Sequence, residues 1–177
     1  MARLTSPGAN LRLVGGILLA IGGILAVIAV VVFTSSSQTT GARLSGLALL
    51  VEGIAVLIVG LGFRGASTQD WASWLLIVGG GLYAIHAIFG FVGVRLTGLP
   101  EALFVTIAAV AILAGAIAVT RSRIGSGSAR AALLVLGIVL TLNALLGDIG
   151  IGGTLVLAIL GLFFVGTGVI IARTARR

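Results

Sequence analysis

The chain has 177 residues, of which 59% are hydrophobic and only 8% are charged, and its mean hydropathy is +1.32. A domain of this length could not expose so apolar a surface to water, so the composition excludes a soluble protein and makes lipid the solvent. The absence of cysteine excludes disulfides and thiolate metal sites. The net charge of +7 comes from arginines that flank apolar runs, as topology signals do, so we expect no nucleic-acid partner.

Six apolar segments follow one another along the chain, each close to the roughly 20 residues that cross a bilayer. They cover residues 11–33, 44–63, 71–94, 102–119, 131–146 and 153–171. Short polar or glycine-containing connections separate them. The sequence therefore predicts an all-α fold, a polytopic bundle of six transmembrane helices in which residues 1–177 form a single integral membrane domain within the lipid bilayer.

The arginines are distributed unevenly between the two ends of these helices. Nine of the eleven lie at the end that holds both chain termini, and only Arg43 and Arg95 lie at the other. The positive-inside rule places the arginine-rich end in the cytoplasm. We therefore expect a multi-pass protein of the cell membrane with cytoplasmic N- and C-termini. Trp71 and Trp74 then become anchors at the cytoplasmic interface, where amphipathic rings are favoured.

An internal repeat relates the first, third and fifth segments, which align without gaps. Residues 13–24 read LVGGILLAIGGI, residues 77–88 read IVGGGLYAIHAI, and residues 134–145 read LVLGIVLTLNAL. Each carries two small residues four apart in register, namely Gly16 and Ala20, Gly80 and Ala84, and Gly137 and Thr141. Because small residues let helices approach closely in lipid, we predict helix contacts at these pairs. The repeating unit is a helical hairpin used three times, over approximately residues 11–64, 71–123 and 131–173.

Polar side chains inside the apolar segments are the candidates for function. Glu52 lies near the middle of the second segment, where an ionised carboxylate is expensive, so it must face protein or water or be protonated. His86 falls at a comparable depth, and Asn143 aligns with it in the repeat. One hypothesis is a buried cluster of Glu52, His86 and Asn143 that accepts or moves protons. The alternative is hydrogen bonding between helices without further function.

Other chemistry lacks the residues it needs. One histidine, no cysteine and four scattered carboxylates do not converge on a metal site, so no metal and no cofactor are expected. Glu101, directly after Pro100, is typical of a helix N-terminus rather than of a catalytic site. No nucleophile motif is present, so we predict that the protein is not an enzyme and has no catalytic residues.

Three glycine- and leucine-rich stretches stand out along the chain: LVGGILLAIGGILAV at residues 13–27, LALLVEGIAVLIVGLGFRG at residues 47–65 and LGLFFVGTGVIIARTARR at residues 160–177. Together they resemble the HdeD-like acid-resistance membrane proteins. That family often has an acidic residue followed by glycine in its second helix, where Glu52 and Gly53 stand here. The resemblance implies a bacterial inner-membrane protein with six helices in hairpin repeats and a role in acid or envelope stress tolerance. It supplies no catalytic mechanism.

Three functions stay open at this point. The first is a non-enzymatic membrane protein of the stress response that acts through its bundle or its partners. The second is a small proton, ion or solute transporter or channel, in which the predicted polar cluster lines a hydrated path. The third is an accessory subunit of a larger membrane complex, whose glycine-rich faces contact another membrane protein or a further copy of the chain.

Overall fold

The computed structural model describes residues 7–35, 38–64, 71–92, 99–123, 125–148 and 154–176. Within these ranges the regular elements are six α-helices. They are α1 (Pro7–Ser35), α2 (Gln38–Phe63), α3 (Trp71–Val92), α4 (Leu99–Arg121), α5 (Gly127–Asp148) and α6 (Thr154–Ala175). Each contains a stretch long and apolar enough to cross a bilayer. The predicted all-α class and the six candidate membrane spans are confirmed.

Several helices extend beyond the apolar segments predicted from the sequence. The first begins at Pro7, a residue suited to the first helical position. The fifth begins at Gly127, where the amide of Ala129 donates to Ser126 Oγ over 3.1 Å and so caps the helix. Hydropathy marks only the apolar part of a helix, whereas capping residues end it in the polar region beyond. Outside the described residues lie positions 93, 94 and 153 of the predicted segments, together with Arg3, Arg95 and Arg177.

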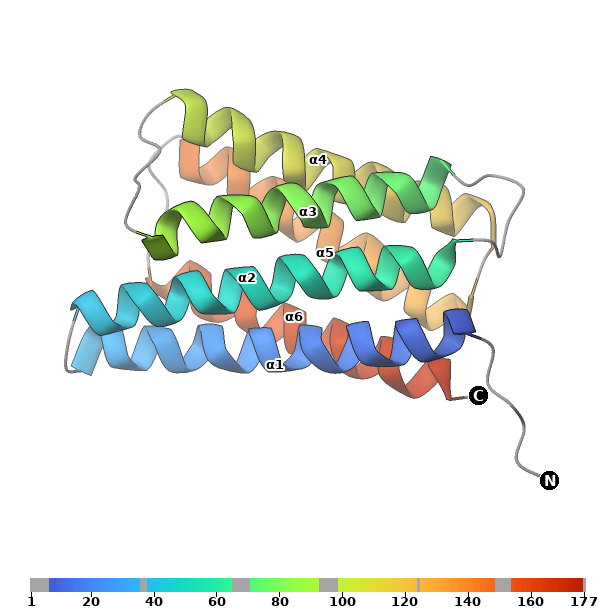
Figure 1. The fold of residues 1–177 in the computed structure, drawn as a ribbon, viewed down its shortest axis with the longest axis horizontal. Coiled ribbons are helices and arrows are strands. Elements are labelled where there is room, and N and C mark those ends of the chain that lie inside the picture. The colour runs from blue at the N-terminus through green and yellow to red at the C-terminus, as the bar shows by residue number, and fades with distance from the viewer. Residues whose placement is uncertain are drawn as a thin grey trace.

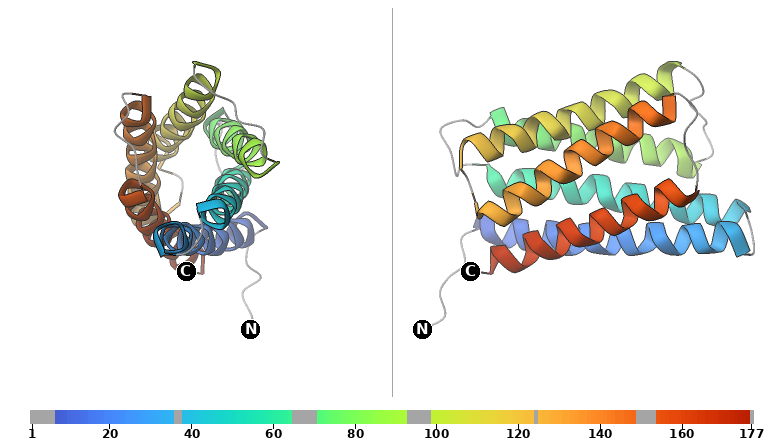
Figure 2. Two further views of the ribbon diagram at one scale, coloured as in Figure 1. Left: turned by 90° about the vertical axis from the view of Figure 1, so that its left-hand side faces the viewer. Right: turned by 180° about the vertical axis from the view of Figure 1, so that it is seen from behind.

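The six helices run alternately up and down and close into a ring (Figure 1). Each helix contacts the next one along the chain, and α1 also contacts α6. The end-on view in Figure 2 shows this closed arrangement. Because the number of antiparallel helices is even, α1 begins and α6 ends at the same end of the ring. Contact between the first and the last helix of the chain therefore closes the ring.

Apolar side chains form both the interior and the outer surface of the ring. Leu19, Leu76 and Ile112 are fully buried and belong to one continuous core. Val92 and Leu155 are large apolar residues that stand exposed, 68% and 72% accessible respectively. A water-soluble bundle would carry polar residues on such faces. This outer surface suits lipid, so the chain is a multi-pass membrane protein.

Glycines set two of the closest helix contacts. A Cβ atom on Gly16 of α1 would lie 2.7 Å from the backbone nitrogen of Ala172 in α6. A Cβ atom on Gly80 of α3 would lie 2.6 Å from the backbone nitrogen of Leu57 in α2. Real Cβ atoms do not approach backbone so closely, so these helix pairs need glycine in order to pack as they do.

Candidate functional site

Glu52 lies on the face of α2 that packs against α1. Ala55 and Val59 follow it on this face at helical spacing, and both approach Gly15 of α1. About two helical turns beyond Gly15, a Cβ atom on Gly22 would lie 2.6 Å from Glu52 Cγ. The missing side chain of Gly22 therefore makes the space that Glu52 occupies.

The carboxyl group of Glu52 is buried in this apolar surrounding. The residue is only 1% exposed, and its Oε1 atom has no hydrogen-bond partner among the described residues. Buried polar atoms are nearly always hydrogen-bonded in folded proteins. An ionisable group within a membrane span is also expensive and is, by default, a candidate functional residue. Glu52 meets both criteria.

Tyr83 of α3 is a titratable neighbour of Glu52. Its side chain is buried, and it lies close enough to Glu52 to interact with the carboxylate charge. The backbones bring the two together, because a Cβ atom on Gly53 would lie 2.5 Å from the backbone nitrogen of Ala84. The sequence contains no signal that pairs Tyr83 with Glu52, since the pairing depends on how α2 and α3 are rotated.

His86 belongs to a different contact, on the side of α3 that faces α4. Gly79 lies seven residues earlier on this side, and a Cβ atom there would meet Ile112 Cγ1 at 2.7 Å. The imidazole ring of His86 lies 6.4 Å from the Phe104 ring, centroid to centroid, and interacts with the charge of Glu101. Its Nδ1 atom is buried without a hydrogen-bond partner among the described residues.

The three residues of the predicted cluster are therefore distributed around the ring. Glu52 contacts α1 and lies near α3, His86 contacts α4, and Asn143 is half-buried on α5. The interactions described for Glu52 and His86 involve different partners. A joint cluster of all three stays a prediction.

Five of the six residues predicted at helix contacts approach a neighbouring helix, and the described bond of the sixth, Thr141, lies within its own helix. Gly16 approaches the backbones of Gly168 and Ala172 in α6, while Gly80 approaches those of Gly53 and Leu57 in α2. In α5, a Cβ atom on Gly137 would lie 2.8 Å from Leu113 Cα in α4. Of their partners four residues later, Ala20 approaches Gly168 and Ala84 approaches Gly53, whereas the hydroxyl of Thr141 donates to the Gly137 carbonyl of its own helix over 2.9 Å.

The arginine-rich end of the ring holds the aromatic and cationic groups predicted for a membrane interface. Trp71 and Trp74 stand exposed in the first turn of α3, and the guanidinium of Arg64 lies 4.7 Å from the centre of the Trp74 ring. Arg12 is half-buried here and donates from Nη1 to the Gly62 carbonyl over 2.9 Å. This contact satisfies a carbonyl at the end of α2, and no sequence pattern predicts it because 50 residues separate the partners.

No metal site is found in the part of the chain that the structure describes, where three or more histidine or carboxylate side chains nowhere converge. Compared with known proteins, the chain matches no family model, no curated protein and no solved structure. The resemblance to the HdeD-like proteins therefore remains an expectation from the sequence.

Proposed function

We propose that this protein is a non-enzymatic membrane protein of acid or envelope stress tolerance, with Glu52 as its proton-responsive group. The observation that carries the proposal is the burial of Glu52 between α1 and α2, with Oε1 unpartnered among the described residues. An ionisable side chain is retained at such a place at a cost of roughly 2.5 kcal/mol or more when it is charged. Proton binding is the chemistry that this carboxyl group can perform.

The proposed mechanism couples the charge of Glu52 to the packing of the ring. Ionised Glu52 would be an uncompensated charge against Gly22 and the apolar core, and protonation would remove that charge. Acid therefore favours close packing of α1 on α2, while neutral pH favours loosening or hydration of this contact. The hydroxyl of Tyr83 is the neighbouring titratable group on α3 and is the candidate partner for the carboxyl.

We further propose that three helical hairpins build the ring and that both termini are cytoplasmic. The contacts of Gly16 with Gly168 and of Gly80 with Gly53 support the repeat, because Gly16 and Gly80 are equivalent in the alignment of the odd-numbered segments. The concentration of arginines at one end supports the orientation in the bacterial inner membrane.

The function is tested by acid survival of a deletion strain that carries the wild type, E52Q or H86A, with protein abundance measured in each strain. We expect E52Q to lose protection at normal abundance, because glutamine keeps the shape of Glu52 but cannot exchange a proton. The matched control is E101Q, which changes a carboxyl group outside the buried site. Full protection by E52Q would contradict the proposed role of this residue.

A small proton transporter is the second candidate, because Glu52 Oε1 and His86 Nδ1 are two of the three buried side-chain polar atoms that lack hydrogen-bond partners among the described residues, the third being Arg130 Nε. Such atoms could be hydrated in a conducting state. Proton flux into liposomes distinguishes this candidate from the first. Flux that the wild type supports and E52Q abolishes would favour transport, whereas acid survival without flux would favour a packing response.

A further inference from the structure

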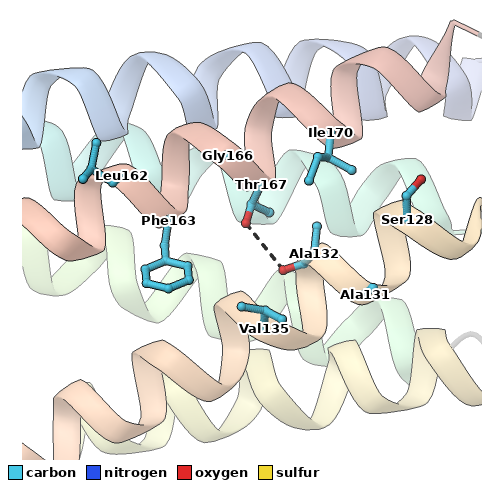
Figure 3. Close-up of a pocket in the computed structure, with 9 residues that line it drawn as sticks. All are labelled: Ser128, Ala131, Ala132, Val135, Leu162, Phe163, Gly166, Thr167 and Ile170. Atoms are coloured by element: carbon cyan, nitrogen blue, oxygen red, sulfur yellow. Dashed lines mark hydrogen bonds between the residues drawn. The ribbon is translucent and has the colours of Figure 1, made fainter.

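An apolar groove runs between α5 and α6 on the outside of the ring. Contacts between these two helices are the sparsest of the six neighbouring pairs. Figure 3 shows the nine residues that line the groove, which has a volume of about 530 Å³. Thr167 of α6 spans it by donating from Oγ1 to the Ala132 carbonyl of α5 over 3.5 Å. Apart from Thr167 and Ser128, the lining side chains are apolar or absent.

The groove lies within two membrane spans, so its surroundings are lipid. Gly166 and Ala131 are exposed on opposite walls of the groove, and a Cβ atom on Gly166 would meet nothing within 4 Å, so this wall has room for an occupant. An apolar recess of this kind does not hold water well, since water needs several polar partners. A flexible hydrocarbon chain matches the apolar lining of the groove and can adapt to its shape.

Positive charge lies at one end of this groove. Arg173 follows Gly166 by seven residues and so projects from the same face of α6, about 10 Å further along the helix. Arg173 and Arg176 are both exposed. Ser128 lines the groove at the same end, in the first turn of α5, where the helix dipole also favours an anion.

We propose that this groove binds an acyl chain of an anionic phospholipid whose headgroup lies at Arg173 and Arg176. Because the two arginines lie just beyond one end of the groove, a lipid headgroup could contact them while its acyl chain enters the groove. Charge complementarity favours this occupant over a second copy of the chain. Two copies packed side by side in the same orientation would bring their arginine-rich ends together, and like charges repel.

The test uses purified, delipidated full-length protein in detergent, titrated in native mass spectrometry with phosphatidylglycerol or phosphatidylcholine of identical acyl chains. We expect the wild type to bind phosphatidylglycerol about tenfold more tightly, given the attraction of two arginines for an anionic lipid. G166L fills the groove and should weaken binding of both lipids about tenfold, as the loss of about two buried methylene groups would. The double variant R173Q/R176Q should lose the preference for phosphatidylglycerol and still bind phosphatidylcholine.

G81L is the matched control, because Gly81 also lies in a membrane span but outside the groove, and a Cβ atom there meets only Leu57 Cδ1 at 3.8 Å. It should bind both lipids like the wild type. If G166L unfolds, A131L fills the groove from the opposite wall and replaces it. Equal binding by the wild type and a folded groove-filling variant would overturn the proposal, as would equal affinity of the wild type for the two lipids. A wild-type dimer that G166L dissociates would identify a second copy as the occupant instead.

Discussion

At the scale of single residues, the arrangement around Glu52 depends on which neighbours lack a side chain. Gly22 makes room for the carboxyl group on one side, and Gly53 brings α3 close enough for Tyr83 to approach on another. The result is a titratable group held in a fixed, apolar place rather than one that reaches the surface. His86 has a different position, against Phe104 and near Glu101. The two residues should therefore respond to pH independently.

The pH dependence of stability follows from this position of Glu52. A neutral carboxyl group costs less to bury than an ionised one, so acid should stabilise the folded ring. Between about pH 7.5 and about pH 5 we expect the wild type to gain about 1 kcal/mol on acidification, because protonation of Glu52 removes the cost of burying its charge. This gain corresponds to a rise of about 2–4 °C in melting temperature. The measurement is thermal unfolding in lipid nanodiscs at several pH values.

E52Q should melt at the acid-stabilised temperature throughout that range, because its amide stays neutral. H86A removes the half-buried imidazole of α3, which lies at a different helix contact from Glu52, and should keep the acid stabilisation of the wild type. A wild-type melting temperature that falls on acidification, or one that E52Q follows in parallel, would rule out Glu52 as the responsive group.

At the scale of helices, glycine lets neighbours approach backbone to backbone, as in the α1–α6 and α2–α3 pairs. The α1–α6 contact is the one that closes the ring, and it joins the first helix to the last through Gly16 and Gly168. In lipid such a contact gains its free energy from close packing and not from a hydrophobic effect. Small changes in side-chain size at this crossing should therefore alter stability more than equal changes on the lipid-facing surface.

G16A tests this expectation. Its new Cβ atom would have to displace the backbone of α6 at Ala172, and such overpacking typically costs about 1–3 kcal/mol. That loss exceeds the gain of up to about 1 kcal/mol from the better helix propensity of alanine. The free energy of unfolding in mild detergent, compared with that of G81A, measures the difference. Equal stability of the two variants would show that the crossing tolerates a side chain and that glycine is not required there.

At the scale of the whole molecule, the ring is apolar outside and carries most of its positive charge at one end. Seven of the described arginines lie at the end where α1 begins and α6 ends, and Arg43 lies at the other. This asymmetry connects two proposals, the cytoplasmic position of the termini and the anionic headgroup beside α5 and α6. Both depend on which side of the bilayer this end faces.

Orientation can be measured with single cysteines, since the chain has none of its own. Ser35 is exposed at the end of α1, and Ser126 is exposed between α4 and α5. In intact cells we expect a membrane-impermeant thiol reagent to label S35C and to label S126C only after the membrane is permeabilised. The reverse pattern would place the arginine-rich end outside and contradict the positive-inside assignment.

Some residues of the candidate site could be predicted from the sequence, and others could not. Glu52 was predictable, because one carboxyl group in the middle of an apolar segment is visible in the sequence itself. Its neighbours were not, because they come from α1 and α3 and depend on rotation of the helices about their axes. A helix that is apolar all round carries no periodic pattern that fixes this rotation. The direction of His86 toward α4 was hidden for the same reason.

The sequence by itself determined that six helices span a membrane, and where arginine and the single buried glutamate lie along them. Those properties depend on local composition, since the bilayer requires about 20 apolar residues and internal backbone hydrogen bonds in each span. Only the tertiary structure decided that α6 packs against α1, that the side chain of Glu52 packs against Gly22, and that a groove lies between α5 and α6. These features arise from packing between side chains that are distant in the sequence. In lipid, the complementary shapes of the helices determine which helices pack together, because the hydrophobic effect does not.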